Sequence, residues 1–171
     1  MKKKQWIAWL LSIVCLLALV ACNGGGNGGE QTGEGEPYSF VINGSVITPG
    51  EGVGSLFVTL NGEAPQISVK ASCLGGVDGE DVTYSYKSFR VQTFRSQANG
   101  EEQIRWVILS DDSVETVKGI AIGDTVEQVK QAYGEPTRTT DSLLIYQRGG
   151  TLLRFKQRDG GITNIDYTVA E

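Results

Sequence analysis

The side chains that could do chemistry are limited by what the chain lacks. Its 171 residues include three cysteines and no histidine. Catalysis by Ser-His-Asp or Cys-His systems is therefore excluded, and the commonest zinc ligand is missing. Carboxylate chemistry, as in glycoside hydrolysis, is the remaining enzymatic class, although no spacing of acidic residues singles out a catalytic pair. These absences favour binding over catalysis.

The acidic segment "GGVDGEDVTY" is the one candidate metal site. It places Asp78, Glu80 and Asp81 in a glycine-rich stretch that we expect to be a loop. Hard oxygen ligands of this kind hold calcium, but their spacing does not fit the twelve-residue EF-hand loop. A solvated acidic turn explains the segment equally well. We therefore expect no cofactor, with calcium at these three residues as the alternative.

The N-terminal residues indicate an exported chain. Three lysines are followed by a short apolar run, Trp6 to Val20, which is typical of a secretory signal. A membrane span needs about 20 apolar residues, so the run is too short for one. The tetrapeptide that ends in Cys22, "LVAC", resembles a bacterial lipobox. That resemblance implies cleavage after Ala21 and a diacylglycerol thioether on Cys22. An ordinary signal with a chance cysteine is the alternative.

A glycine-rich tether is expected next. Residues 22–36 contain no large apolar side chain, so they cannot offset the entropy of ordering. A glycine-rich coil of this length reaches about 5–6 Å × √n, on the order of 20 Å. The expected organisation is a signal peptide over 1–21, a lipidated cysteine and tether over 22–36, and one domain over 37–171. The protein would then be anchored to the extracytoplasmic face of the cell membrane. The residue after Cys22 is not the aspartate that retains Gram-negative lipoproteins at the inner membrane, and we favour a Gram-positive host.

Charge limits the partners of the processed chain. Loss of residues 1–21 removes three lysines and no acid, which leaves 12 basic and 20 acidic residues and a net charge of −8. A negative domain is a poor match for nucleic acid, so no nucleic-acid partner is expected. Cys73 has no cysteine partner left in the processed chain. A reactive thiol needs basic neighbours, and the local sequence offers only Lys70, so we expect Cys73 to be a small buried core residue.

A helix is predicted near the middle of the second half of the chain, in "GIAIGDTVEQVKQAYGEP". Asp124 and Thr125 are suitable N-caps, and Glu127 and Gln128 follow at capping-box distance. Val126, Val129, Ala132 and Tyr133 recur at helical spacing, and Gly134 and Pro136 end the pattern. The segment predicts a short helix over Thr125–Ala132. A looser copy of the motif, "VITPGEGVGSLFVTLNGEAP", spans Val46 to Pro65. It predicts a weaker, irregular helix, with a strand as the alternative, because it contains Gly52 and Gly54.

Strands are predicted after each copy of the motif. Alternating and β-branched residues indicate three strands after each, with hairpin turns at "QANGEE", "RGG" and "RDGG". The ranges are Val82–Lys87, Phe89–Phe94, Gln103–Leu109, Leu143–Gln147, Thr151–Lys156 and Ile162–Thr168. We therefore predict an α+β fold of two tandem units, about 37–112 and 113–171. Each unit would be a short helix plus a three-stranded antiparallel meander, with the helices packed on one face of the sheet.

The second unit resembles two families. The motif "GIAIGDTVEQVKQAYGEP" followed by hairpins is similar to the small outer-membrane lipoproteins that include the assembly component BamE. It is also similar to the tandem-repeat fold of β-lactamase inhibitory proteins. The resemblance covers about 50 residues and implies a fold that binds other proteins through its sheet surface and loops. The chain lacks the paired disulfides of the inhibitors, so β-lactamase inhibition is not implied.

Candidate binding residues are aromatic and basic. Tyr84 and Tyr86 share one face of a predicted strand, and Trp106 is the last tryptophan in the chain. Aromatic residues are enriched at interfaces, although burial in the core explains these three as well. A basic cluster near the last hairpin could face an acidic wall polymer, although a solvated sheet face is the commoner meaning of such a cluster; it contains Arg148, Arg154, Lys156 and Arg158. We predict a non-enzymatic, membrane-anchored module that binds an envelope protein or wall component. The alternative is a small carboxylate-dependent hydrolase of envelope polymers.

Overall fold

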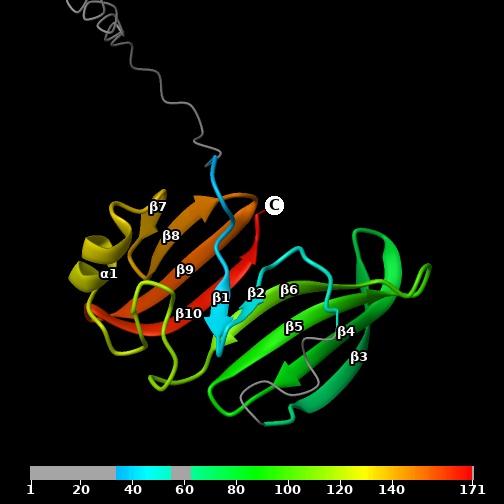
Figure 1. Ribbon diagram of the computed structural model, residues 1–171. Helices are drawn as coiled ribbons and strands as arrows, with labels where there is room; N and C mark the ends of the chain where they lie inside the picture. The colour runs from blue at the N-terminus through cyan, green and yellow to red at the C-terminus, as the bar shows by residue number, and fades with distance from the viewer. Residues whose placement is uncertain (1–33, 55–62, 171) are drawn as a thin grey trace, which may run out of the picture. The chain divides into compact units, whose positions relative to one another are not determined.

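The computed structural model describes residues 34–54 and 63–170 (Figure 1). Within these residues the chain forms strands with one helix between the sixth and seventh. In chain order they are β1 (Phe40–Ile42), β2 (Ser45–Ile47), β3 (Gln66–Leu74), β4 (Val77–Ser85), β5 (Phe89–Ser96), β6 (Glu102–Leu109), α1 (Val126–Tyr133), β7 (Arg138–Thr140), β8 (Leu143–Arg148), β9 (Thr151–Arg158) and β10 (Gly161–Val169).

Eight strands form one antiparallel sheet in the order β3-β4-β5-β6-β10-β9-β8-β7, and β1 and β2 form a separate hairpin. Each half of the sheet is a meander of four consecutive strands. The halves meet where β6 pairs with β10, with Leu109 opposite Ile165. The two halves of the chain therefore share a single continuous sheet.

Tight turns with left-handed residues produce most of the hairpins. The two residues between strands have positive φ at Asn43–Gly44, Gly75–Gly76, Gly149–Gly150 and Asp159–Gly160. Two-residue turns with φ > 0 at both positions match the twist of antiparallel strands, and Asn-Gly, Asp-Gly and Gly-Gly favour them. These turns explain why the sheet consists of neighbouring hairpins rather than crossovers.

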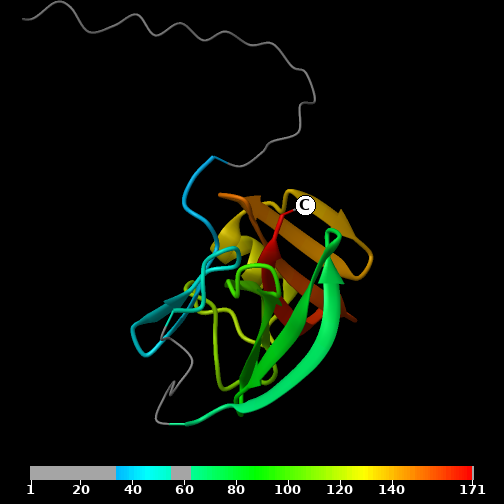
Figure 2. The same cartoon turned by 90° about the vertical axis from the view of Figure 1, so that its right-hand side faces the viewer.

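The core lies on one face of the sheet. Phe89, Leu109, Ile165, Phe155 and Leu144 follow one another across five strands and are all buried. Two elements cover this face (Figures 1 and 2). The hairpin β1–β2 inserts the Phe40 ring 5.1 Å from that of Phe89, and α1 places the Tyr133 ring 5.4 Å from that of Phe155.

Helix α1 confirms the capping signals of the sequence. Thr125 is the N-cap: its hydroxyl accepts the Gln128 N–H at 3.2 Å, and the Gln128 side chain accepts the Thr125 N–H at 2.9 Å. Gly134 ends the helix with φ of 82°. Val129 is fully buried. Since helices of this length are marginal alone in water, packing on the sheet must stabilise α1.

The predicted fold class is wrong. Strands account for 55% of the described residues and helix for 6%, so the domain is mostly β and does not consist of two helix-plus-sheet units. In the first motif copy, Ser45–Ile47 is strand β2, and residues 55–62 lie outside the described part. The backbone of Gly50 and Val53 instead donates to carbonyls of β6, at 2.7 and 3.1 Å. Glycines that disfavour a helix let this segment follow a strand edge.

Candidate functional site

The sheet has a second face, opposite α1 and the β1–β2 hairpin, which we call the open face. Val107 and Leu109 of β6 belong to the core. Because neighbouring residues of a strand point to opposite faces, Trp106 and Ile108 lie on the open face. Asp166 of β10 and Arg154 of β9 lie in register with Ile108. Side chains that face each other on neighbouring strands are close enough to interact, so Ile108, Asp166 and Arg154 form one continuous surface.

A groove of about 540 Å³ crosses this open face. We call it the basic groove. Its charged and aromatic lining residues come from four strands, β5, β6, β9 and β10, with the last arginine at the end of β9. They are Arg90, Trp106, Arg154, Lys156, Arg158 and Asp166.

Arg154 of the basic groove contacts both an acid and an aromatic ring. Its Nε and Nη2 atoms donate to Asp166 Oδ2 at 2.7 and 2.6 Å. The guanidinium carbon lies 4.9 Å from the centre of the Trp106 ring, a cation–π contact. Trp106 is nevertheless 38% exposed. The arrangement presents an aromatic edge and a cation together on the surface.

Asp166 works mainly to position Arg154. Burial raises the pKa of this carboxyl, and the charge and hydrogen bond of Arg154 oppose that rise. Both arginine contacts fall on the same oxygen of the carboxylate. The charge of Asp166 balances that of Arg154, and Arg90, Lys156 and Arg158 remain as the other positive charges of the groove.

Three cations of the basic groove are available to a ligand. Arg90, Lys156 and Arg158 are exposed, and none forms an ion pair within the described part of the chain. Arg154, Lys156 and Arg158 alternate along β9, which separates neighbours on one face by about 6.6–6.8 Å. On a domain with excess acid, this row of positive charge is a local exception that attracts anions.

The predicted basic cluster is divided by the structure. Arg148 points to the core side: its guanidinium carbon lies 4.3 Å from the centre of the Tyr38 ring, and its Nε donates to the Glu36 carbonyl at 2.7 Å. It does not contribute to the basic groove. Arg90, on β5, takes a place there that the sequence interpretation missed. The available signal was its alternation with Phe89 and Val91, both buried.

The predicted aromatic set is divided as well. Tyr84 and Tyr86 lie on the core face and are each 8% exposed, whereas Trp106 lies on the open face. The Tyr86 ring stacks on Phe89 at 4.5 Å, and burial, with a smaller contribution from Tyr84, raises the Tyr86 pKa to about 12. The three residues do not form one binding surface.

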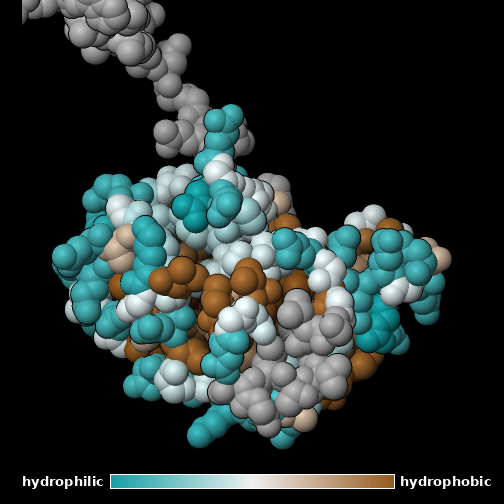
Figure 3. Space-filling model, in the orientation of Figure 1, coloured by the Kyte–Doolittle hydropathy of each residue, from teal (hydrophilic) through white to brown (hydrophobic). Residues whose placement is uncertain are grey.

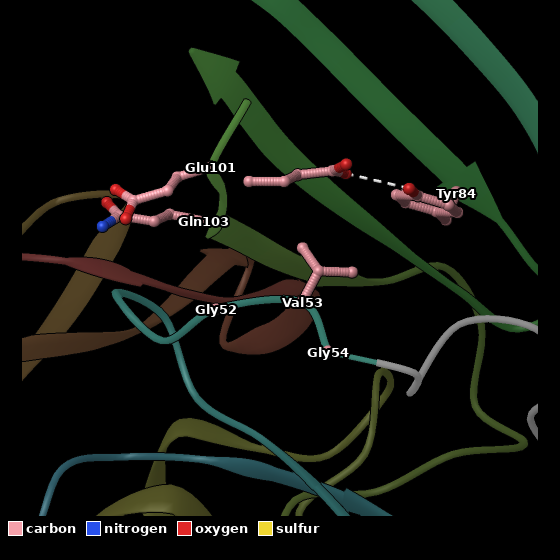
Figure 4. Close-up of a pocket in the computed structure, with 7 residues that line it drawn as sticks. Gly52, Val53, Gly54, Tyr84, Glu101 and Gln103 are labelled. Atoms are coloured by element: carbon pink, nitrogen blue, oxygen red, sulfur yellow. Dashed lines mark hydrogen bonds between the residues drawn. The ribbon is translucent and has the colours of Figure 1, made fainter. Parts of the chain in front are cut away.

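A second pocket, of about 500 Å³, lies beside Glu102 on the core side (Figure 4). The Tyr84 hydroxyl donates to Glu102 Oε1 at 2.8 Å, and Thr93 donates to the same oxygen at 2.5 Å. Arg95 Nε donates to Glu102 Oε2 at 2.9 Å, and Arg95 Nη1 donates to Glu80 Oε2 at 3.2 Å. The Glu102 carboxylate has donors on both oxygens, which indicates a structural role.

The pKa of Glu102 points the same way. Burial raises it, but the hydrogen bonds from Thr93, Tyr84 and Arg95, with the arginine charge, outweigh burial and lower it overall. A general acid in glycoside hydrolysis needs a raised pKa and a second carboxyl nearby. Asp166 has a raised pKa but lies on the opposite face of the sheet, so it cannot act with Glu102 on one substrate.

The acidic segment is part of a strand and does not form the expected loop. Asp78, Glu80 and Asp81 all lie in β4. Alternation places Asp81 on the open face and the other two on the core side, where Glu80 pairs with Arg95. The residues that the structure describes contain no group of three Cys, Asp or Glu side chains arranged to hold a metal ion.

The structure tests the prediction for Cys73 but not the one for Cys22. Cys73 is exposed, so the expectation of a buried core thiol is wrong. It lies on β3, an edge strand that has a neighbour on one side only among the described strands. Cys22 lies outside the described residues, and its lipidation stays a prediction. No helix in the described ranges is long and apolar enough to cross a membrane.

An apolar patch is visible on the core side. Figure 3 shows it over the β1–β2 hairpin, where Val41 and Val46 are exposed. These two residues face each other in the hairpin and alternate with the buried Phe40, Ile42 and Ile47. The hairpin is thus apolar on both sides and buries only one of them.

Comparison with known proteins adds no family to this geometry. No protein-family model, curated protein or solved structure matches the chain. The resemblance to the BamE-containing lipoproteins and to β-lactamase inhibitory proteins therefore stays a prediction.

Proposed function

We propose that the protein is a non-enzymatic binding module of the cell envelope whose basic groove holds an acidic wall polymer. The observation that supports this most is the combination of Arg90, Lys156 and Arg158, without ion pairs among the described residues, beside an exposed Trp106. The processed chain has a net negative charge, so its overall charge does not explain why this one surface is basic.

The geometry of β9 suits an extended chain of anionic groups. Arg154, Lys156 and Arg158 project from the same face at intervals of about 6.6–6.8 Å. A polymer with one anionic group per repeat can follow this row, while Trp106 packs against its apolar backbone. Asp166 already balances the charge of Arg154, so Lys156 and Arg158 are the cations of β9 that remain for the polymer.

The membrane part of the proposal rests on the sequence. Lipidation of Cys22 would hold the module at the outer side of the cell membrane, and the glycine-rich residues would let it reach the wall. Two acyl chains anchor a protein stably, whereas one does so only marginally.

Sedimentation with wall fragments tests the groove. The full chain, solubilised in mild detergent, is mixed with fragments that carry their anionic polymer and with fragments stripped of it by acid. We expect co-sedimentation with the first alone. The variant K156E should bind several-fold more weakly, whereas K87E, an equal charge reversal at the exposed β4–β5 turn, should bind like the native protein. Equal binding to stripped fragments, or equal loss in both variants, would contradict the proposal.

A further inference from the structure

The two edges of the eight-stranded sheet are built differently. β7 has only three residues, so it offers little edge for pairing, while a proline stands before both edge strands, Pro136 before β7 and Pro65 before β3. β3 has nine residues, contains no proline, and pairs with β4 without a bulge. Proteins usually protect sheet edges by shortness, proline, charge or bulges, and β3 has one charge, Lys70, as its only such device.

Side chains along β3 are exposed on both faces of the sheet. Ile67 is 62% and Val69 49% exposed, on the side that carries the core farther along the sheet. Figure 2 looks towards this end of the sheet, with β3 outermost. Within the described residues β3 pairs with β4 alone, so its outer backbone groups can accept another strand.

We propose that this edge pairs with β3 of a second copy of the chain. The strands would run antiparallel about a two-fold axis at Val69. Val69 then faces its own copy, Ile67 faces Ala71, and Ser68 faces Lys70. The paired stretch covers seven residues, Gln66 to Ser72.

The pattern of β3 favours this partner and this register. Apolar residues meet apolar residues on one face, and polar residues meet polar residues on the other, which is the requirement for cross-strand pairing. An axis at Lys70 would place two lysines opposite each other, and like charges directly opposite are destabilising. An axis at Ala71 would leave Ile67 beyond the strand pair. An axis at Ser68 would also place Ile67 opposite Val69 and separate the lysines, but it would pair only the five residues from Gln66 to Lys70. The axis at Val69 meets both conditions over seven residues, so we favour it.

Disulfide trapping in cells tests the axis. In full chains that carry C73S, we compare V69C with I67C after mild oxidation. V69C should give a covalent dimer on a non-reducing gel, because residue 69 faces its copy. I67C should not, because the two thiols introduced at position 67 lie four residues apart along the paired strands. The double variant I67C/A71C should restore the dimer. The C73S parent reports any cross-link through other thiols.

Each outcome decides the proposal. A covalent dimer in V69C and I67C/A71C, with none in I67C, supports it. Equal trapping of V69C and I67C would show random collision and overturn it. Absence of a V69C dimer, or a V69C adduct of another mass, would mean that this edge is free or holds a different protein. Independently, the detergent-solubilised native chain should sediment as a dimer and V69K as a folded monomer, with unchanged far-UV circular dichroism. A native monomer would also overturn the proposal.

Discussion

Replacement of Glu102 by glutamine should reduce stability in a pH-dependent way. The substitution turns one carboxylate oxygen into an NH₂ group and removes the negative charge. The Arg95 bonds at 2.9 Å from Nε and 2.8 Å from Nη2 then either lose their acceptor or, with the amide oxygen turned to Arg95, lose its negative charge. A hydrogen bond to a charged group contributes about 1.5–3 kcal/mol. Since the Arg95 side chain is 40% exposed, solvent screening reduces this to about 1–2 kcal/mol.

The pH dependence follows from the direction of the shift. Folding lowers the Glu102 pKa below its ordinary value of 4.5, so the fold favours the ionised form. The stability it contributes is present above pH 4.5 and is lost as the pH falls through the folded-state pKa. Glutamine cannot ionise, so E102Q should be less stable than the native chain near neutral pH and similar to it in strong acid.

Urea unfolding followed by far-UV circular dichroism measures this difference at several pH values. The control is E101Q, which changes the neighbouring exposed residue. It should cost little at any pH, because the Glu101 bond to Asn99 is on the surface. A loss in E102Q that is the same at every pH, or no loss near neutral pH, would refute the argument.

Four further predictions concern single residues. V129D places a charge at a fully buried position and should cost at least about 3 kcal/mol in urea unfolding; an unchanged midpoint would show that α1 is not docked. G79A should cost about 1–3 kcal/mol, because a Cβ would lie 2.4 Å from a carbonyl oxygen, whereas G161A should cost much less, since its nearest contact is 3.8 Å. Cys73 should react quickly with a maleimide in the native chain; protection until denaturant is added would place it in an interface or core. Labelling with a tagged fatty acid should fail in C22S, and equal label in native protein and variant would exclude the lipobox.

Local structure was predictable where the signal lies within a few residues. The capping pair of Thr125 and Gln128 identified α1, and the Gly149–Gly150 and Asp159–Gly160 turns identified the last two hairpins. The Gly75–Gly76 turn carries the same signal, and β3 alternates apolar and polar residues before it. The turn lies in the stretch that was expected from the sequence to be a loop, and β3 was not among the predicted strands. The merging of both meanders into one sheet depends on pairing between β6 and β10, which no local pattern encodes.

The site was harder to predict because bulges change which face a residue occupies. Simple alternation puts Ile104 and Trp106 on the same face. In the structure Gln92 faces Trp106 and Thr93 faces Ile104, so Arg105 is an extra residue that moves Trp106 to the open face. A second register shift, between Ile162 and Asn164, brings Asp166 opposite Arg154. Sequence patterns indicated Trp106, Arg154, Lys156 and Arg158 but neither Arg90 nor Asp166, and the two bulges determine that Trp106, Arg154 and Asp166 meet.

The salt dependence of polymer binding tests the central claim most directly. The dissociation constant of the full chain for purified anionic wall polymer is measured over a range of salt, for the native protein, K156E and K87E. Cations that bind a polyanion release counterions, so affinity should fall steeply with salt, and loss of one contacting cation should reduce the slope by about one. We predict a shallower slope for K156E and the native slope for K87E. Binding that does not respond to salt, or equal slopes in all three proteins, would contradict a basic groove that holds an acidic polymer.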